Sequence, residues 1–269
     1  MSSSPKAPPQ LASAWPYPRW IAHRGAGKLA PENTLAAIRQ GAELGYRMFE
    51  CDVRVSRDGV AFLQHDSSLR RTTGRKGLAT HRSWPELSQL DAGTWHSPEH
   101  AGEPIASLAG VARYCLANNL CLNIEIKASA RDGLASGRHI AQEASSYWRL
   151  RPDLPPPLIT SFEPLALEGA REAAPDLPRG LLLSRRHRHW RKTAGKLGCI
   201  AVIPHHALIN QKLMDEAHAD GLKVLSYTVN EAAEATRLAL LGVDGLITDE
   251  VKKFLPASWP SAEPVPTNA

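Results

Sequence analysis

Short apolar runs that end in charged or polar residues recur along the sequence, and this pattern constrains the fold more than any other feature. Ile21-Ala22 leads into His23-Arg24-Gly25, and a second run ends in Glu50-Cys51-Asp52-Val53. Later runs end in Gln64-His65-Asp66 and in Asn123-Ile124-Glu125-Ile126-Lys127. Charged groups at the carboxyl ends of successive buried strands are typical of α/β barrels, which build their active sites there.

The apolar runs alternate with helix-like segments, and this alternation predicts parallel strands joined by crossover helices. The runs are short and do not alternate between polar and apolar residues, which suits strands buried on both faces. Strands are expected at about 21–22, 49–53, 60–63, 120–127, 158–160, 180–183, 199–203, 223–228 and 245–247. Helices are expected at about 33–45, 107–118, 164–174, 188–197, 210–220 and 231–241.

Two features depart from a regular eight-fold repeat. The strand candidates number one too many, and only Arg54 to Gly59 separates the second from the third, too few residues for a helical crossover. Residues 66–106 form a polar segment with no clear helix, which predicts an inserted element. We therefore expect an irregular TIM (β/α)8 barrel over residues 16–255, with a small insertion after the third strand at about 66–106. Residues 1–15 and 256–269 are expected to be disordered tails.

The net charge of +5 comes from one segment of the chain. Residues 184–196 hold six Lys or Arg and no acid, and outside them the sequence has 26 basic and 27 acidic residues. This distribution does not match a nucleic-acid-binding surface. The segment is either a solvated helix face or a positive patch near the barrel mouth that attracts anionic substrates.

Cysteine usage and the N-terminus indicate the compartment. The four cysteines include no CxxC pair, and three lie in apolar runs, so we expect buried, reduced thiols. The first 20 residues contain five prolines and no continuous apolar stretch, so neither a signal peptide nor a membrane span is predicted. We expect a cytoplasmic protein of unknown oligomeric state.

Three acidic residues form a candidate metal site. Glu50 and Asp52 are two positions apart on a strand and so point to the same face, and Glu125 and Lys127 repeat this spacing on another strand. Burying neighbouring carboxylates is costly unless a cation compensates them. Three hard oxygen ligands without sulfur suit Mg²⁺ or Ca²⁺ better than zinc. The alternative is a structural network of ion pairs with cations such as Arg24 and Lys127.

Two histidines and two cations complete the candidate site. His23 and His65 follow different strands, so we expect both at one barrel mouth, where they suit a general acid and a general base. Arg24 and Lys127 would supply positive charge for a phosphate group. Together with a metal ion, this set indicates phosphodiester cleavage.

These motifs resemble the glycerophosphodiester phosphodiesterase family in type and order. The resemblance extends from about residue 20 to residue 250. It is carried by the following segments: His23-Arg24-Gly25, Pro31-Glu32-Asn33-Thr34, Glu50-Cys51-Asp52-Val53, His65-Asp66, Asn123-Ile124-Glu125-Ile126-Lys127, Ser161-Phe162, Tyr227-Thr228-Val229-Asn230 and Gly242-Val243-Asp244-Gly245-Leu246-Ile247-Thr248-Asp249.

The resemblance implies a distorted TIM barrel that hydrolyses small glycerophosphodiesters, such as glycerophosphocholine or glycerophosphoethanolamine, to sn-glycerol 3-phosphate and an alcohol. It implies one divalent cation, Mg²⁺ or Ca²⁺, as cofactor. The implied metal ligands are Glu50, Asp52 and Glu125, the implied acid and base are His23 and His65, and the implied phosphate contacts are Arg24 and Lys127. Either the substrate's glycerol hydroxyl attacks phosphorus to give a cyclic phosphate, or water attacks directly; the sequence leaves both routes open.

Two further residues are candidates for substrate contact. Tyr227 stands where the family commonly has tryptophan, so an aromatic face is kept. Phe162 is either a second apolar wall or ordinary core. A phospholipase acting on intact lipids is a rival interpretation, and so is a barrel that only binds a phosphate ligand or nucleic acid. A purely binding barrel would have lost catalytic positions, whereas both histidines and all three carboxylates are present.

Overall fold

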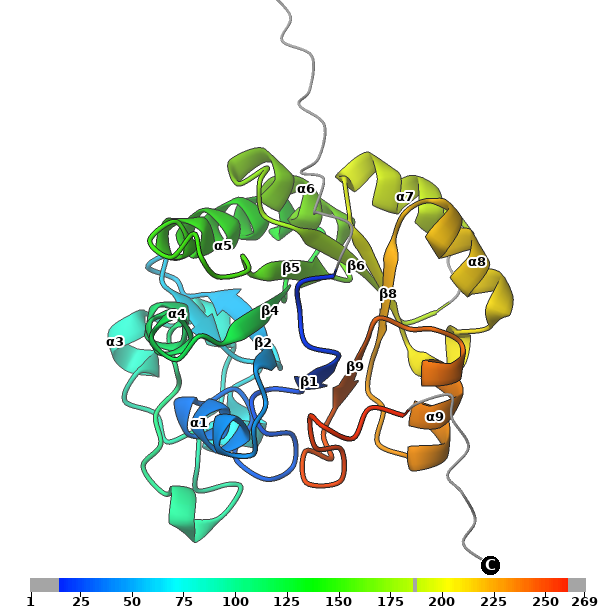
Figure 1. Ribbon diagram of the computed structural model, residues 1–269. Coiled ribbons are helices and arrows are strands. Elements are labelled where there is room, and N and C mark those ends of the chain that lie inside the picture. The colour runs from blue at the N-terminus through cyan, green and yellow to red at the C-terminus, as the bar shows by residue number, and fades with distance from the viewer. Residues whose placement is uncertain (1–14, 186–187, 261–269) are drawn as a thin grey trace, which may run out of the picture.

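The computed structural model describes residues 15–185 and 188–260, which form a closed barrel with helices around it (Figure 1). In this described part, β1 pairs in parallel with both β2 and β9 and so closes a ring of eight parallel strands. This confirms the predicted (β/α)8 architecture. The parallel strands are β1 (Trp20–Ala22), β2 (Met48–Val55), β4 (Cys121–Ile126), β5 (Leu158–Ser161), β6 (Arg179–Leu183), β7 (Ala201–Pro204), β8 (Lys223–Ser226) and β9 (Gly245–Thr248).

The longer helices form the outer layer, and Figure 1 shows them arranged around the strands. Several begin where a side chain accepts a hydrogen bond from the first turn, as Thr34, Ser107 and Asn210 do. These helices are α1 (Leu35–Glu43), α4 (Leu108–Ala117), α5 (Gly133–Trp148), α6 (Pro164–Ala173), α7 (Trp190–Leu197), α8 (Gln211–Ala219) and α9 (Ala232–Leu240), with the short 3₁₀ helix η3 (His206–Leu208) before α8.

The ninth strand, which is additional to the eight parallel ones, follows the short connection noted at residues 54–59. β3 (Ala61–Leu63) runs antiparallel to β2, and the turn between them occupies only residues 56–60. The insertion follows β3 and contains α2 (Arg70–Thr73), η1 (Ala79–His81), α3 (Trp84–Leu87) and η2 (Pro98–His100). It has a small apolar core made of Phe62, Leu69, Ala79, Leu87, Ala92 and Ile105. β3 therefore ends at the barrel mouth, and the insertion starts beside the polar residues gathered there.

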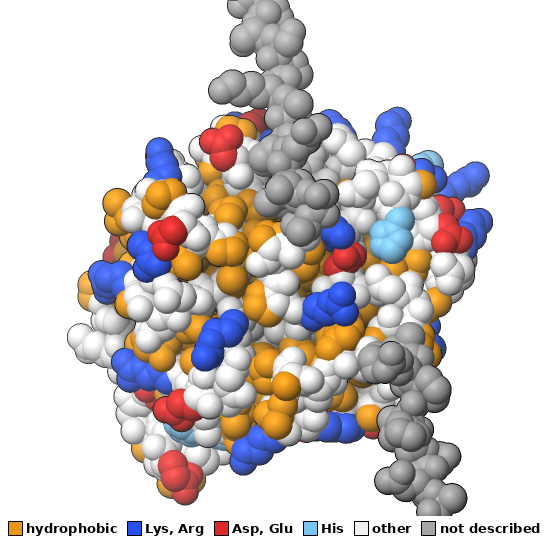
Figure 2. Space-filling model, viewed as in Figure 1, with side chains coloured by type: hydrophobic (Ala, Val, Ile, Leu, Met, Phe, Trp, Pro, Cys, Tyr) orange, Lys and Arg blue, Asp and Glu red, His pale blue; other side chains and the backbone are white. Residues whose placement is uncertain are grey.

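The segment before β1 covers one end of the barrel. Tyr17 packs on residues that begin several strands, including Met48 and Leu158, and its hydroxyl donates a hydrogen bond of 2.7 Å to the carbonyl of Pro156. The main core lies between the strands and the helices. In the view of Figure 2, apolar side chains gather at the centre of the molecule, with Lys and Arg side chains among and around them.

One helix was missed in the sequence, and one boundary was predicted wrongly. No helix was assigned between β4 and β5, yet α5 lies there and is the longest helix in the described residues. The folded part also extends beyond residue 255, because Trp259 packs edge-on against Trp20 with ring centroids 5.3 Å apart. Of the two expected tails, residues 1–14 and 261–269 lie outside the described residues. All four cysteines are free and buried, as predicted. None of the described helices has the length and apolar character that crossing a membrane requires.

Candidate active site

The parallel register of β2 and β4 brings three carboxylates together at the barrel mouth. Asp52 lies directly opposite Glu125 on the neighbouring strand, and Glu50 lies two positions before Asp52 on the same face. One oxygen from each carboxylate lies within 4.8 Å of the others. All three residues are buried, with exposed fractions of 3% for Glu50, 1% for Asp52 and 9% for Glu125. Such a set of hard oxygen donors could hold a divalent cation.

The protonation behaviour of the carboxylates reflects this crowding. Burial, together with the negative charge of Asp52, raises the pKa of Glu50 to about 8. Burial and the charge of Asp52 also raise the pKa of Glu125. Among the described residues, nothing hydrogen-bonds the buried Oε1 of Glu50, although its Oε2 accepts a 3.1 Å hydrogen bond from the backbone N–H of Arg24. A cation between these groups would remove their repulsion and supply the missing partner, so the residues fit a metal ion.

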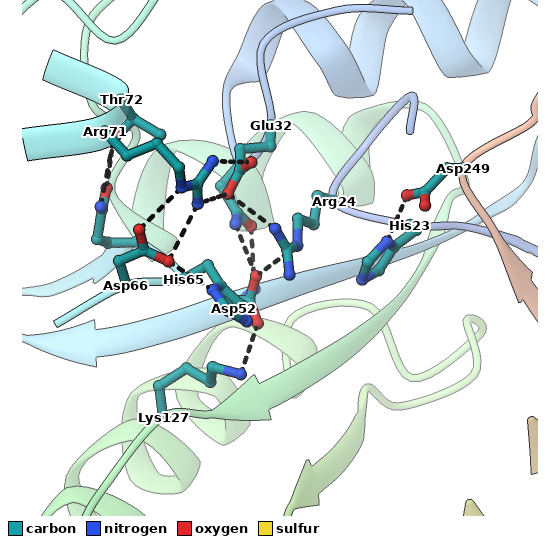
Figure 3. Close-up of polar contacts among 12 residues, drawn as sticks. His23, Arg24, Glu32, Asp52, His65, Asp66, Arg71, Thr72, Lys127 and Asp249 are labelled. Carbon is teal, nitrogen blue, oxygen red and sulfur yellow. Dashed lines mark hydrogen bonds and ion pairs between the residues drawn. The ribbon is translucent and has the colours of Figure 1, made fainter. Parts of the chain in front are cut away.

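Two cations and one amide hold Asp52 in place (Figure 3). Nε of Arg24 lies 3.2 Å from Asp52 Oδ2, and Nζ of Lys127 lies 3.3 Å from its Oδ1 and 2.6 Å from Glu125 Oε1. Asn33 donates from Nδ2 to Asp52 Oδ2 at 2.8 Å and accepts from the backbone N–H of Asp52 at 3.0 Å. Burial alone would raise the pKa of Asp52, but Lys127 and Arg24 lower it to about 2, so this carboxylate is ionised.

His23 directly follows β1, and its ring is oriented by Asp249, which directly follows β9. Its Nδ1 lies 2.6 Å from Oδ1 of Asp249, whose Oδ2 accepts a 3.0 Å hydrogen bond from Nδ2 of Asn230. Its Nε2 faces the carboxylates, 3.8 Å from Glu50 Oε2. Burial opposes the charged imidazole, but the hydrogen bond to Asp249 and the charge of Glu50 outweigh it and raise the pKa of His23.

His65 has an equivalent partner at the end of β3. Its Nδ1 lies 2.8 Å from Oδ1 of Asp66, whose Oδ2 accepts a 2.8 Å hydrogen bond from Nε of Arg71. Arg71 also donates to Glu32, which in turn accepts from Arg24. Burial is the main cause of the lowered pKa of His65. Figure 3 shows His65 and His23 on opposite sides of Arg24, each beside its own aspartate.

Aromatic side chains from the other half of the barrel lie next to this cluster. Phe162, after β5, and Tyr227, after β8, pack edge-on with ring centroids 5.6 Å apart. The ammonium of Lys127 lies 5.8 Å from the centroid of Phe162. Phe162 is 37% exposed, so it is a wall of the cleft and not core. The hydroxyl of Tyr227 donates to the carbonyl of Leu183 at 3.1 Å, which fixes its ring at the mouth.

All nine residues singled out from the sequence therefore lie at one end of the barrel. The carboxylates, Arg24, Lys127 and His23 form one connected group, and Phe162 and Tyr227 border it. The sequence did not assign roles to Asp249, Asp66 or Asn33. A signal for Asp249 was present, since it directly follows β9 just as His23 directly follows β1.

The basic residues of segment 184–196 are of two kinds: some form ion pairs on the surface of α7, and others line crevices beside β6. On α7, Arg191 lies 2.5 Å from Asp220 and Lys196 lies 3.9 Å from Glu168, so part of the segment is an ordinary paired surface. Arg185 and Arg188 instead line crevices beside β6. Residues 186 and 187 lie outside the described residues.

Comparison with known proteins gives a consistent set of relatives. Residues 23–253 match the glycerophosphoryl diester phosphodiesterase family. A glycerophosphodiester phosphodiesterase of Caldanaerobacter subterraneus subsp. tengcongensis is 30% identical over 235 residues, covering 87% of this chain and 95% of the relative. An Oleispira antarctica phosphodiesterase solved in complex with the product sn-glycerol-3-phosphate superposes with a TM-score of 0.81 at 31% identity, covering 88% and 95% of the two chains. A glycerophosphodiester phosphodiesterase of Agrobacterium tumefaciens, 24% identical with a TM-score of 0.74, shares the fold and covers 88% of this chain and 99% of its own.

Proposed function

Because the chain belongs to the glycerophosphoryl diester phosphodiesterase family, we propose that it hydrolyses small glycerophosphodiesters with a divalent cation and two histidines. Its enzyme class, a glycerophosphodiester phosphodiesterase, follows from that membership. The proposed substrates are compounds such as glycerophosphocholine and glycerophosphoethanolamine, and the products are sn-glycerol 3-phosphate and the alcohol. One observation carries the proposal: three buried carboxylates lie within 4.8 Å of one another beside two histidines that each have an aspartate partner.

Glu50, Asp52 and Glu125 are the residues that would hold the cation, with Mg²⁺ and Ca²⁺ as the candidates. When bound, a divalent cation there would neutralise negative charge on a phosphodiester and polarise its phosphoryl oxygen. Arg24 and Lys127 flank the carboxylates and would bind the remaining phosphate oxygens. These two cations therefore position the phosphorus between the histidines.

The two histidines move the protons. Nδ1 of each ring is held by its aspartate, which leaves Nε2 of His23 and of His65 to face the reacting oxygens. One Nε2 takes a proton from the attacking hydroxyl, and the other gives a proton to the departing alcohol. The attacking hydroxyl belongs either to water or to the substrate's own glycerol, in which case water opens a cyclic phosphate in a second step.

Phe162 and Tyr227 would pack against the apolar faces of the substrate on the side of Lys127. The Oleispira antarctica relative, which binds sn-glycerol-3-phosphate as product, supports a glycerol phosphate group in this cleft. Tyr227 uses its hydroxyl to bind the backbone at Leu183, so its ring and not its oxygen is offered to the substrate.

The experiment that tests the proposal is hydrolysis by purified protein from which metal has been removed with a chelator. Glycerophosphocholine and glycerophosphoethanolamine are supplied with Mg²⁺, with Ca²⁺ or without metal, and sn-glycerol 3-phosphate is measured by a coupled assay. The proposal predicts release that depends on one of the two ions. Equal release without metal, in the presence of chelator, would contradict the proposed cofactor, and no release from folded protein would contradict the proposed substrates.

A further inference from the structure

One arginine of the insertion, Arg71 on α2, binds two carboxylates at the barrel mouth (Figure 3). Its Nε lies 2.8 Å from Oδ2 of Asp66, and its Nη2 lies 3.1 Å from Oδ1 of the same carboxylate. Its Nη1 and Nη2 also donate to the two oxygens of Glu32, at 2.6 and 2.8 Å. All three nitrogens of the planar guanidinium are used, so this group fixes where the two carboxylates lie relative to each other.

Each of these carboxylates holds one side chain that the proposed reaction uses. Asp66 Oδ1 lies 2.8 Å from Nδ1 of His65. The hydrogen bond from Arg71 is the main cause that keeps the pKa of Asp66 well below its usual range, so Asp66 is ionised and accepts from the imidazole. Glu32 Oε1 accepts a hydrogen bond of 3.0 Å from Nη1 of Arg24. Arg71 is therefore joined to His65 and to Arg24 through one carboxylate each.

The insertion in turn holds Arg71 in place. The guanidinium lies 5.6 Å from the ring centroid of Trp95, a cation–π contact. The next residue, Thr72, is buried, and its hydroxyl accepts a 3.2 Å hydrogen bond from Nε2 of Gln64, the residue before His65. The Arg71 side chain is 41% exposed, and exposed ion pairs add little to the free energy of unfolding. The main effect of these contacts is therefore on the geometry of the mouth.

Loss of the Arg71 guanidinium would change the surroundings of both carboxylates. Of the described residues, only Arg24 would remain as an ion-pair partner of Glu32. Nε of Arg24 already lies 3.2 Å from Asp52, so Glu32 would compete with Asp52 for the same guanidinium. Asp66 would lose the two-point contact that fixes its plane, and with it the ring of His65 would lose a fixed acceptor.

We propose that Arg71 is a positioning residue of the phosphodiesterase, which orients His65 through Asp66 and Arg24 through Glu32. This inference rests on the proposed function, in which His65 moves a proton and Arg24 binds the phosphate. It also gives the insertion a role in the reaction. The insertion supplies the side chain that keeps the proton-transferring ring and the phosphate-binding guanidinium in a fixed relative position.

The first test compares Arg71→Gln with Arg70→Gln in the hydrolysis of glycerophosphoethanolamine with metal present. Arg70 is the preceding residue, is exposed and lies outside this network, so its variant is the matched control. Arg71→Gln should lower kcat by about 10- to 100-fold, because the His65 ring is displaced. It should also raise KM by about tenfold, the effect of losing one hydrogen bond to a charged group. Arg70→Gln should match the wild type in both constants.

Double variants show whether Arg71 acts through the two carboxylates. Asp66→Asn should lower kcat with little change in KM, and Glu32→Gln should raise KM with little change in kcat. Adding Arg71→Gln to Asp66→Asn should leave kcat within about twofold and raise KM, whereas adding it to Glu32→Gln should lower kcat and leave KM within about twofold. If the single effects simply multiply in both pairs, Arg71 acts independently of the carboxylates, for example by binding substrate itself, and the inference is overturned.

Nitrogen NMR of histidine-labelled protein gives a readout that does not depend on activity. At pH 8 the His65 ring is neutral, because its pKa lies below the ordinary value of 6.5, and its proton is on Nδ1, facing Asp66. The His65 signals, assigned by their loss in His65→Gln, should move toward the Nε2-protonated form in Arg71→Gln and stay in place in Arg70→Gln. Unmoved His65 signals in Arg71→Gln would overturn the inference.

The outcomes separate this inference from the proposed function. Wild-type hydrolysis with unchanged kcat and KM in Arg71→Gln would overturn the positioning role and leave the proposed function standing. No hydrolysis by folded wild-type protein would overturn the proposed function, and a role of Arg71 in that reaction would fall with it.

Discussion

Asp249 lies 2.6 Å from Nδ1 of His23, although 226 positions separate the two residues in the sequence. The closure of the barrel explains this contact, because β9 pairs directly with β1 and both residues immediately follow their strands. Asn230 holds the other oxygen of Asp249 at 3.0 Å. The last strand of the barrel therefore orients a side chain at the end of the first.

Replacing Asp249 with asparagine should weaken catalysis without unfolding the protein. Asp249 raises the pKa of His23, so its removal lowers that pKa and moves the pH-profile limb governed by His23 to lower pH. Without the carboxylate that orients the His23 ring, kcat should fall by roughly 10- to 100-fold, and KM should change much less. Steady-state kinetics between pH 5 and 9 would measure both effects.

Glu250→Gln is the matched control for this substitution. Glu250 is the next residue, and its carboxylate pairs with Lys28 at the surface, 2.7 Å away. Its kcat and pH profile should equal those of the wild type. A pH profile that stays in place for Asp249→Asn would show that Asp249 does not act on His23.

Gly27 keeps room for the backbone of Asp249. It has a φ of +57°, and a Cβ placed on it would lie 2.0 Å from the carbonyl oxygen of Asp249. Gly27→Ala should therefore displace Asp249 and disturb His23, lowering kcat and reducing the free energy of unfolding by about 1–3 kcal/mol. Denaturant unfolding and the hydrolysis assay would measure the two effects.

Gly59→Ala separates the steric clash from backbone strain. Gly59 also has a positive φ, +84°, but no atom lies within 4 Å of a Cβ placed there. The Gly59→Ala variant should lose free energy of unfolding through backbone strain alone, and its kcat should equal that of the wild type. Equal losses of activity in the two variants would contradict a specific role for the space beside Asp249.

The metal-free protein should become more stable when Glu50 is replaced with glutamine. Burial and the charge of Asp52 raise the pKa of Glu50 from 4.5 to about 8, so the folded state binds a proton that the unfolded state has already released between these pH values. Glu50 thus destabilises the metal-free protein increasingly as pH rises from about 4.5 to about 8. At pH 8 with chelator, Glu50→Gln should gain roughly 1–4 kcal/mol in the free energy of unfolding.

The same variant distinguishes a metal site from a structural ion-pair network. Added Mg²⁺ or Ca²⁺ should raise the melting temperature of the wild type, by the equivalent of about 2.7 kcal/mol at a concentration 100-fold above Kd. The variant lacks one ligand and should respond much less. If Glu50→Gln instead lowers the stability of the chelated protein at pH 8, Glu50 is a member of a stabilising network and the metal site is contradicted.

The strands and the residues at their ends could be predicted from the sequence because both follow a local rule. Parallel strands buried on both faces read as short apolar runs, and the polar residue after each run must lie at the barrel mouth. This rule placed His23, Glu125 and Lys127 correctly. The short connection at 54–59 excluded a helical crossover between the second and third strands, and in the structure β3 pairs antiparallel with β2.

The remaining features depend on contacts that no local pattern reveals. The α5 sequence contains two glycines and three serines, which lower its helix propensity. The structure uses Gly137 for close packing, because a Cβ there would lie 2.0 Å from the carbonyl oxygen of Ala166 on α6. Thr34 caps α1, whereas the neighbouring Asn33 binds Asp52 on β2. Trp259 is half-buried through its edge-on contact with Trp20, which is 239 positions earlier in the sequence.

We propose that His23 and His65 move the protons of a metal-dependent phosphodiester cleavage. The most direct test measures sn-glycerol 3-phosphate release from glycerophosphoethanolamine by the wild type, His23→Ala and His65→Ala with metal present, alongside the metal-induced shift in melting temperature of each. Each substitution should lower kcat at least about 100-fold, while the metal should still stabilise the folded protein. A variant that keeps kcat within a few-fold of the wild type would contradict the role given to that histidine.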